Sequence, residues 1–126
     1  NRSVIEQLER IAPVTAVSGN VDAYEESGFP TEATIQLNGF RIAIRHVVFE
    51  AGKLTKEGRA FLDRIRQDIC IFGHTHQPRK EWLGDMLLFN PGSAGPKRFT
   101  LPRMVGVITI GAQLLARHVR LEDRIA

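Results

Sequence analysis

Three of the four histidines of this 126-residue sequence follow short apolar segments. His46 comes after Phe40–Arg45, whereas His74 and His76 come after Ile69–Phe72. An imidazole nitrogen is a good ligand for divalent transition metals, and the rings of His74-Thr75-His76 are spaced to reach one ion or two neighbouring ions. A His-x-His pair in a loop is also common as a solvated feature, so this motif alone leaves both interpretations open.

Asn20 supplies a fourth polar side chain at a comparable place. It lies in Ser18-Gly19-Asn20-Val21-Asp22, directly after the apolar run Val14–Val17. A carboxamide oxygen also binds divalent metals. The motif is equally typical of a turn, because Asn and Asp tolerate left-handed backbone and form Asx-turns.

These side chains share a position at the end of a predicted strand. Val14–Val17 and Ile69–Phe72 are continuous apolar runs, as in buried strands. Phe40–Arg45 alternates in polarity and is joined to Ala33–Leu37 by Asn38-Gly39, which predicts a hairpin. Ligands of open α/β sheets bind beyond the carboxyl ends of the strands. We therefore expect the four polar side chains to meet on one rim of a sheet.

The rest of the pattern predicts an α/β protein. Helical spacing runs over residues 3–11 and 55–66, with Ser3 and Thr55 as predicted caps. Buried strands, hairpins and flanking helices in this order predict a mixed sheet, or two sheets packed face to face with helices outside. Further strands are predicted in a hairpin over Glu81–Phe89 and in the runs Met104–Ile110 and Gln113–Leu121.

Composition restricts the class of protein. With 43% hydrophobic and 25% charged residues, residues 1–126 are expected to form one folded domain. No apolar run reaches the roughly 18–20 residues of a membrane span. The net charge of +3 suits an acidic substrate, but no basic run interleaved with aromatic residues predicts a nucleic-acid partner. Cys70 is the single cysteine, which favours a reducing, cytoplasmic location.

Four motifs occur together in one order: Ser18-Gly19-Asn20-Val21-Asp22, His46, Gly73-His74-Thr75-His76 and Asn90-Pro91-Gly92-Ser93. In this combination the sequence resembles the calcineurin-like metallophosphoesterase superfamily, and in particular its small bacterial and archaeal phosphodiesterases. The resemblance covers nearly the whole chain. It implies two packed mixed β-sheets flanked by helices, with a site for two metal ions at one end.

The resemblance also implies metal ligands. Asn20, His46 and His74 would bind one divalent ion, and His76 would bind the other. Mn, Ni, Co, Fe or Zn would suit this mixed shell of nitrogen and oxygen. The implied reaction is hydrolysis of a phosphodiester, or of a phosphomonoester, by a metal-bound hydroxide.

Two further residues are predicted to act on the substrate, Asp22 from the same resemblance and Arg98 from its place, beside Lys97, after Asn90-Pro91-Gly92-Ser93. Asp22 lies where the family places a group near the scissile phosphate, so Asp22 and His74 are the predicted catalytic residues. An Asx-turn is the alternative for Asp22. Arg98 would contact the substrate phosphate, with a solvated basic loop as its alternative.

The sequence departs from the family pattern in two places. It has no Asp-x-His motif, and its only Gly-Asp, Gly84-Asp85, lies in a predicted turn. We therefore expect an N-terminal β-α-β segment with the missing ligands to precede Asn1; the alternative is a protein that lacks it and holds at best half of the metal site. After His46, Val47 and Val48 replace the usual Gly and His, which implies a different local backbone.

These departures keep a second function open, namely a catalytically weak or inactive scaffold. A retromer subunit that resembles these enzymes serves as a scaffold on this fold. The retained pair His74 and His76 favours the enzyme instead. A nuclease is the least favoured function, because the sequence shows no added DNA-binding element. The sequence does not decide whether the protein forms a homo-oligomer.

Overall fold

The structure is a computed structural model that describes residues 2–19, 28–64, 67–95 and 101–121. Its helices are α1 (Arg2–Glu9) and α3 (Lys56–Arg64). Its strands are β1 (Glu32–Leu37), β2 (Phe40–Arg45), β3 (Phe49–Glu50), β4 (Lys53–Leu54), β5 (Ile69–Ile71), β6 (Arg79–Leu83), β7 (Met86–Asn90), β8 (Met104–Ile110) and β9 (Leu114–Arg120).

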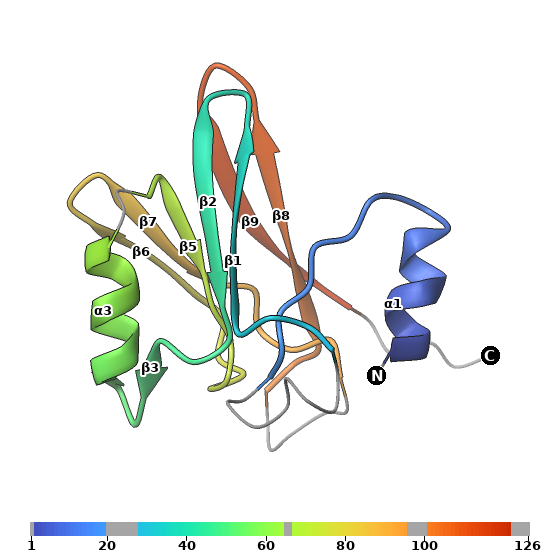
Figure 1. Cartoon of the computed structure of the whole chain (residues 1–126), viewed down its shortest axis with the longest axis horizontal. Helices are drawn as coiled ribbons and strands as arrows, with labels where there is room; N and C mark the ends of the chain where they lie inside the picture. The colour runs from blue at the N-terminus through green and yellow to red at the C-terminus, as the bar shows by residue number, and fades with distance from the viewer. Residues whose placement is uncertain (1, 20–27, 65–66, 96–100, 122–126) are drawn as a thin grey trace.

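A five-stranded mixed sheet in the order β1-β2-β5-β7-β6 forms the centre of the fold (Figure 1). Strands β2, β5 and β7 run parallel in the middle, and β1 and β6 are antiparallel to their neighbours at the two edges. The edge hairpins turn at Asn38-Gly39 and Gly84-Asp85, as predicted. Strands β8 and β9 form a second, antiparallel sheet. The predicted α/β fold with two packed sheets is confirmed.

The three central strands alternate their side chains between two apolar layers. Ala43, Cys70 and Leu88 occupy one register row and pack in a cluster with Phe61 of α3. The preceding row, Ile42, Ile69 and Leu87, packs on the other face with Ala116 of β9. Because successive side chains of a strand point to opposite faces, one sheet separates α3 from the β8–β9 ribbon.

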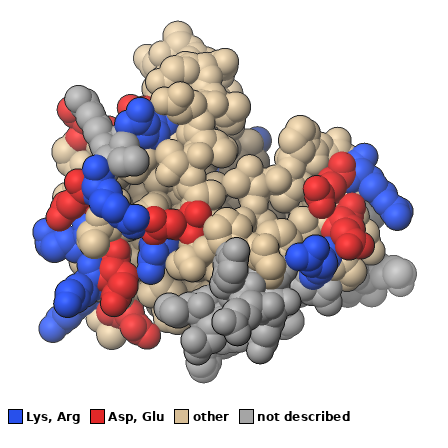
Figure 2. All heavy atoms as spheres, viewed as in Figure 1, with Lys and Arg blue, Asp and Glu red and all other residues tan. Residues whose placement is uncertain are grey.

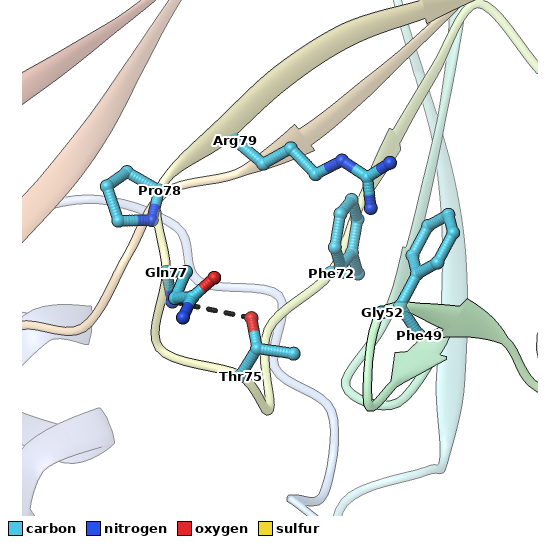
Figure 3. Close-up of a pocket in the computed structure, with 7 residues that line it drawn as sticks. All are labelled: Phe49, Gly52, Phe72, Thr75, Gln77, Pro78 and Arg79. Carbon is cyan, nitrogen blue, oxygen red and sulfur yellow. Dashed lines mark hydrogen bonds between the residues drawn. The ribbon is translucent and has the colours of Figure 1, made fainter.

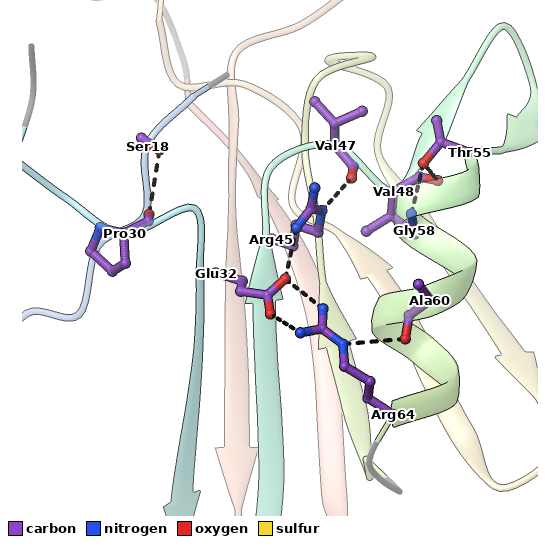
Figure 4. Close-up of polar contacts among 10 residues, drawn as sticks. All are labelled: Ser18, Pro30, Glu32, Arg45, Val47, Val48, Thr55, Gly58, Ala60 and Arg64. Carbon is purple, nitrogen blue, oxygen red and sulfur yellow. Dashed lines mark hydrogen bonds and ion pairs between the residues drawn. The ribbon is translucent and has the colours of Figure 1, made fainter. Parts of the chain in front are cut away.

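The N-terminus of α3 is tied to the segment that follows β2. Thr55 caps the helix as predicted, because its hydroxyl accepts a hydrogen bond from the Gly58 N–H at 2.9 Å (Figure 4). The same hydroxyl donates to the Val48 carbonyl at 3.1 Å, and that carbonyl also accepts from the Thr55 N–H at 2.9 Å. These bonds fix the backbone two residues after His46.

A second set of polar contacts joins the end of β2 to the end of α3. The Glu32 carboxylate on β1 pairs with Arg45 on β2 at 2.7 Å and with Arg64 on α3 at 2.6 Å (Figure 4). Burial raises the pKa of Glu32, but the hydrogen bonds and positive charges of Arg64 and Arg45 outweigh burial, so the pKa lies below its ordinary value. The neighbour of Arg45 in sequence is His46, so this ion pair stabilises the strand end that carries it.

Two predictions about the first twenty residues are wrong. The run Val14–Val17 forms no strand, because it pairs with none of the strands in the described part of the chain; three of its four residues are partly buried and Thr15 is exposed. The neighbouring Ser18 is held differently, by a backbone hydrogen bond to the Pro30 carbonyl at 2.8 Å. Helix α1 begins at Arg2, so Ser3 lies within its first turn and is not its cap.

The surface carries mixed charge on the side of α3. In Figure 2, blue and red side chains alternate there, in keeping with the helix sequence, which places Glu57, Asp63 and two arginines among its nine residues. On the face shown, the basic side chains therefore do not form a continuous patch. In the ranges that the structure describes, neither helix has the length and apolar character that crossing a bilayer requires.

Candidate metal centre

The histidines predicted to bind metal lie at one edge of the central sheet. His46 follows β2, and His74 and His76 lie in the loop after β5, the parallel neighbour of β2. Parallel neighbours end at the same edge, so the topology brings the three residues together. The rings of His46 and His74 meet edge to face, with their centroids 5.4 Å apart and an interplanar angle of 84°.

The backbone beside these rings is closely fitted. The Gly73 N–H donates to the His46 carbonyl at 2.9 Å, which joins the two strand ends. A Cβ atom at Gly73 would lie 3.2 Å from Nδ1 of His46, so a larger residue would crowd the ring. His74 and His76 have φ angles of 73° and 63°, a left-handed conformation that non-glycine residues adopt at a cost. Strain of this kind is typical of functional loops.

The ring of His76 carries a buried nitrogen that lacks a partner. Its Nδ1 atom is shielded from solvent and makes no hydrogen bond to any of the described residues. An unsatisfied buried polar atom is destabilising, and a bound cation is a natural partner for an imidazole lone pair. The donor chemistry of this edge therefore fits a transition metal.

His46 is poised to act as a neutral ligand. Burial lowers the pKa of its ring, and the nearby charges of His74 and His76 lower the pKa further. A lowered pKa favours the uncharged imidazole, which is the form that binds metal.

Glu50 is a neighbour of this cluster that the sequence did not reveal. Its Oε1 atom lies 3.4 Å from Nε2 of His74. The short strands β3 and β4 pair Glu50 with Lys53 and turn the chain back so that the carboxylate approaches the histidine loop. No motif marks such a contact, because it depends on a hairpin of only two residue pairs.

The motif Asn90-Pro91-Gly92-Ser93 is joined to the histidine loop by side-chain hydrogen bonds of Asn90. Asn90 is completely buried, and its Nδ2 atom donates to the Thr75 hydroxyl at 3.2 Å and to the Gly73 carbonyl at 3.4 Å. Its Oδ1 atom accepts from the Gly92 N–H at 2.9 Å. These hydrogen bonds make the motif a support for the loop that carries His74 and His76.

His118 contacts the same motif. Its Nε2 atom lies 2.7 Å from the Asn90 carbonyl oxygen, and its ring stacks on Phe89 with centroids 4.7 Å apart. The strand sequence, in which His118 lies between Arg117 and Val119-Arg120, suggests a surface position, but the side chain is partly buried. β9 runs across the sheet and brings His118 beside the end of β7.

Three predicted site residues, Asn20, Asp22 and Arg98, lie outside the described residues. Within residues 2–19, 28–64, 67–95 and 101–121, no three His, Cys, Asp or Glu side chains are grouped closely enough to hold a metal ion. His46, His74 and His76 are therefore neighbours at one edge of the sheet, and their role as metal ligands stays a prediction. The complete set stays a prediction.

A mixed sheet packed against a second sheet, with histidines gathered at one end, is the architecture of metallophosphoesterase-like domains. The model of the calcineurin-like phosphoesterase superfamily domain matches residues 1–113. The chain is 34% identical over 118 residues to a probable metallophosphoesterase of Methanothermobacter thermautotrophicus, an alignment that covers 93% of this chain and 68% of the relative. The chain belongs to the calcineurin-like phosphoesterase superfamily.

Two further similarities agree with this assignment. A probable metallophosphoesterase of Methanocaldococcus jannaschii is 29% identical over 125 residues, covering 98% of this chain and 62% of the relative. The structure of vacuolar protein sorting 29 from Cryptosporidium parvum superimposes with a TM-score of 0.76 at 23% identity, covering 98% of this chain and 71% of that one. This structural similarity shows the fold. The chain spans about two thirds of the length of the two archaeal relatives.

Proposed function

We propose that the protein is a metal-dependent phosphodiesterase with a centre for two divalent ions. Family membership supports a phosphoester substrate, and the archaeal relatives carry the name of probable metallophosphoesterases. The single observation that carries the proposal is the buried Nδ1 of His76, which has no partner among the described residues and lies in a strained loop beside His46 and His74. A protein without a metal would gain nothing from leaving that nitrogen unsatisfied.

The ligand roles follow the predicted arrangement. His46 and His74 would hold one ion together with Asn20, and His76 would hold the second. Mn, Ni, Co, Fe or Zn fits these donors. When bound, such ions would supply an activated water and neutralise charge on the phosphoryl oxygens. Imidazole ligands carry no charge of their own, so the centre stays positive and attracts an anionic ester.

The residues of the chain itself orient the site. Asn90 holds the loop of His74 and His76 through hydrogen bonds to Gly73 and Thr75, which fixes the loop backbone that carries the two rings. We assign Asp22 to the scissile phosphate and Arg98 to the substrate phosphate, as their motifs predict. The substrate is a phosphodiester, or a phosphomonoester, in solution.

The test is hydrolysis of bis(p-nitrophenyl) phosphate by the full-length protein with Mn²⁺, Ni²⁺, Co²⁺ or Zn²⁺. We expect metal-stimulated release of nitrophenolate, loss of that release in EDTA, and recovery on adding metal back. The His74→Ala variant should lose metal and turnover together, whereas Lys56→Ala, an exposed change on α3, should keep both. An absence of turnover with all four metals would refute the proposal.

A protein-binding scaffold is the second candidate, and two observations favour it. Val48, at the position where the family usually has a second histidine, is fully buried in the core. Helix α1 buries no side chain and leaves Val4 and Leu8 about half exposed. Titration with Mn²⁺ separates the candidates, because a scaffold without a metal centre should bind none, and His74→Ala should then change nothing.

A further inference from the structure

A hollow lies beside the histidine loop and shares its walls. Its volume is about 310 Å³, which is within the range of sites for small organic groups. Thr75, which stands between His74 and His76, lines it together with Gln77 and Pro78 from the same loop (Figure 3). Phe49 lines the opposite side, and the next residue, Glu50, contacts His74. The hollow therefore lies against the two segments that carry His74, His76 and Glu50, although none of these three residues lines it.

The wall opposite the loop is aromatic. Phe49 and Phe72 both line the hollow, with ring centroids 5.2 Å apart and an interplanar angle of 48°. The ring of Phe72 is almost completely buried, whereas Phe49 is partly exposed. Flat apolar walls favour a planar guest, because an aromatic ring can pack on them by offset or edge-to-face contact.

An arginine side chain that is paired with a carboxylate closes one side of the hollow. The guanidinium carbon of Arg79 lies 4.3 Å from the centroid of Phe49 and stacks on that ring. Glu81 holds the guanidinium in place with contacts of 2.7 and 2.8 Å. The stacked guanidinium is flat, so it offers a further planar surface to an electron-rich ring, while the Glu81 carboxylate balances its charge.

The loop side offers polar groups. The Thr75 hydroxyl accepts hydrogen bonds from Asn90 and from the Gln77 N–H, at 3.2 and 3.3 Å, and keeps its own proton to donate. The Gln77 side chain is exposed and lies along the hollow in Figure 3, where its amide can donate or accept. An aromatic guest with polar edge atoms would find partners here.

We propose that this hollow binds an ester group of the phosphoester substrate and selects a planar aromatic group over a small alkyl group. The proposal rests on the proposed function, because it requires a phosphoryl group at the histidine loop. A single loop then serves both parts of the substrate, with His74 and His76 at the phosphoryl end and Thr75 and Gln77 at the ester end. Two kinds of aromatic group share this chemistry, a simple aryl ring and a nucleobase.

Competitive inhibitors of bis(p-nitrophenyl) phosphate hydrolysis test the preference. Phenylphosphonate and methylphosphonate have the same phosphonate group and differ only in the ring. Phenylphosphonate should bind about tenfold more tightly than methylphosphonate, because burying the apolar surface of a ring lowers the dissociation constant by at least that factor. Adenosine 5′-monophosphate against ribose 5-phosphate makes the same comparison for a nucleobase. Tighter binding of the aromatic member in either pair supports the proposal. The pair that shows it tells whether the hollow accepts a simple aryl ring or a nucleobase.

Variants test whether the hollow is responsible. Phe49→Leu keeps apolar bulk but removes the flat wall, and should reduce the aromatic preference to about threefold or less. The matched control is Phe61→Leu, which lies in the same core cluster and also beneath an arginine, but does not line the hollow. It should lose stability and keep the preference. If Phe49→Leu does not fold, Gln77→Phe should fill the hollow with a second ring and remove the preference for the aromatic member of each pair.

The outcomes separate the two proposals. Hydrolysis with equal inhibition by the aromatic and alkyl members of both pairs would overturn the pocket and leave the phosphodiesterase standing. A preference that survives both Phe49→Leu and Gln77→Phe would also overturn it, because the ring would then bind elsewhere. If the protein neither hydrolyses the diester nor binds any phosphonate or phosphate, both proposals fail together.

Discussion

The side-chain amide of Asn90 donates a hydrogen bond to the hydroxyl of Thr75, 15 residues earlier in the chain. This contact joins the Asn90-Pro91-Gly92-Ser93 motif to the Gly73-His74-Thr75-His76 motif. It is made possible by the parallel pairing of β5 and β7, which sets Ile71 beside Phe89 and so brings the two following loops together. A conformation that is costly for His74 and His76 is thereby held by a neighbouring strand end.

Replacing Asn90 should lower the affinity of the protein for metal. Asn90→Ala removes both hydrogen bonds to the histidine loop and leaves the Gly92 N–H without its acceptor. Replacing a residue that positions metal ligands typically lowers metal affinity by about 10–100-fold. We expect a loss of that size in calorimetric titration with Mn²⁺.

The control for this prediction is Asn38→Ala. Asn38 occupies a left-handed turn position and bonds to the Ile110 carbonyl, so its loss should lower stability by about 1 kcal/mol. It has no contact with the histidine loop, and metal affinity should stay unchanged. Equal losses of metal affinity in both variants would show that Asn90 acts only through general stability.

The sequence predicted the parts of this fold that depend on local chemistry. Asn38-Gly39 specifies its hairpin because both residues tolerate positive φ, and Thr55 caps α3 because its hydroxyl satisfies a free N–H. The histidine cluster was also predictable, since His46 and His74 follow strands that run parallel. In these cases a few neighbouring residues contain the whole physical cause.

Features that depend on distant contacts were not predictable. Val14–Val17 has the composition of a strand, but a strand exists only where another backbone pairs with it, and no local pattern reports that. His118 resembles a surface residue among arginines, yet β9 carries it onto Phe89 and the Asn90 carbonyl. The contact between Glu50 and His74 likewise depends on how one small hairpin folds back.

Gly58 should be intolerant of a side chain although it lies in a helix. Glycine to alanine normally stabilises a helix by about 1 kcal/mol. Here a Cβ atom would collide with the Val48 backbone and the Thr55 hydroxyl. Gly58→Ala should therefore destabilise the protein by about 1–3 kcal/mol in urea unfolding.

Ala60→Gly on the exposed face of the same helix is the matched variant. It should cost about 1 kcal/mol, the ordinary price of glycine in a helix. If Gly58→Ala instead proves more stable than the parent protein, that result would contradict the close packing of Gly58 against the Val48 backbone.

Cys70 should be inert in the folded protein. It is fully buried in the middle of β5, and burial raises the pKa of its thiol to about 12. The thiolate is the reactive form, so its population at pH 8 is negligible. Ellman's reagent should label the unfolded protein in urea within minutes and the native protein only as fast as it opens. Rapid labelling of the native protein would contradict the packing of Cys70 between Ala43 and Leu88.

The ion pairs of Glu32 should make stability depend on pH in a defined direction. Burial raises the pKa of Glu32, yet Arg64 and Arg45 lower it by a greater amount, so the folded protein holds the carboxylate below its ordinary pKa of 4.5. A carboxyl group with a lowered pKa in the folded state contributes stability that is fully present above its unfolded pKa. That contribution is lost as the pH falls through the lower, folded pKa.

Glu32→Gln tests this linkage directly. At pH 7 the variant should melt about 2–4 °C below the parent protein, since partly exposed ion pairs contribute modestly. As the pH falls below about 4.5 the difference should shrink, because the parent then loses the same charge. Glu57→Gln, on the exposed first turn of α3, is the control and should show a smaller change at pH 7. A difference between Glu32→Gln and the parent that grows on acidification would show that burial, and not the two arginines, dominates the pKa of Glu32.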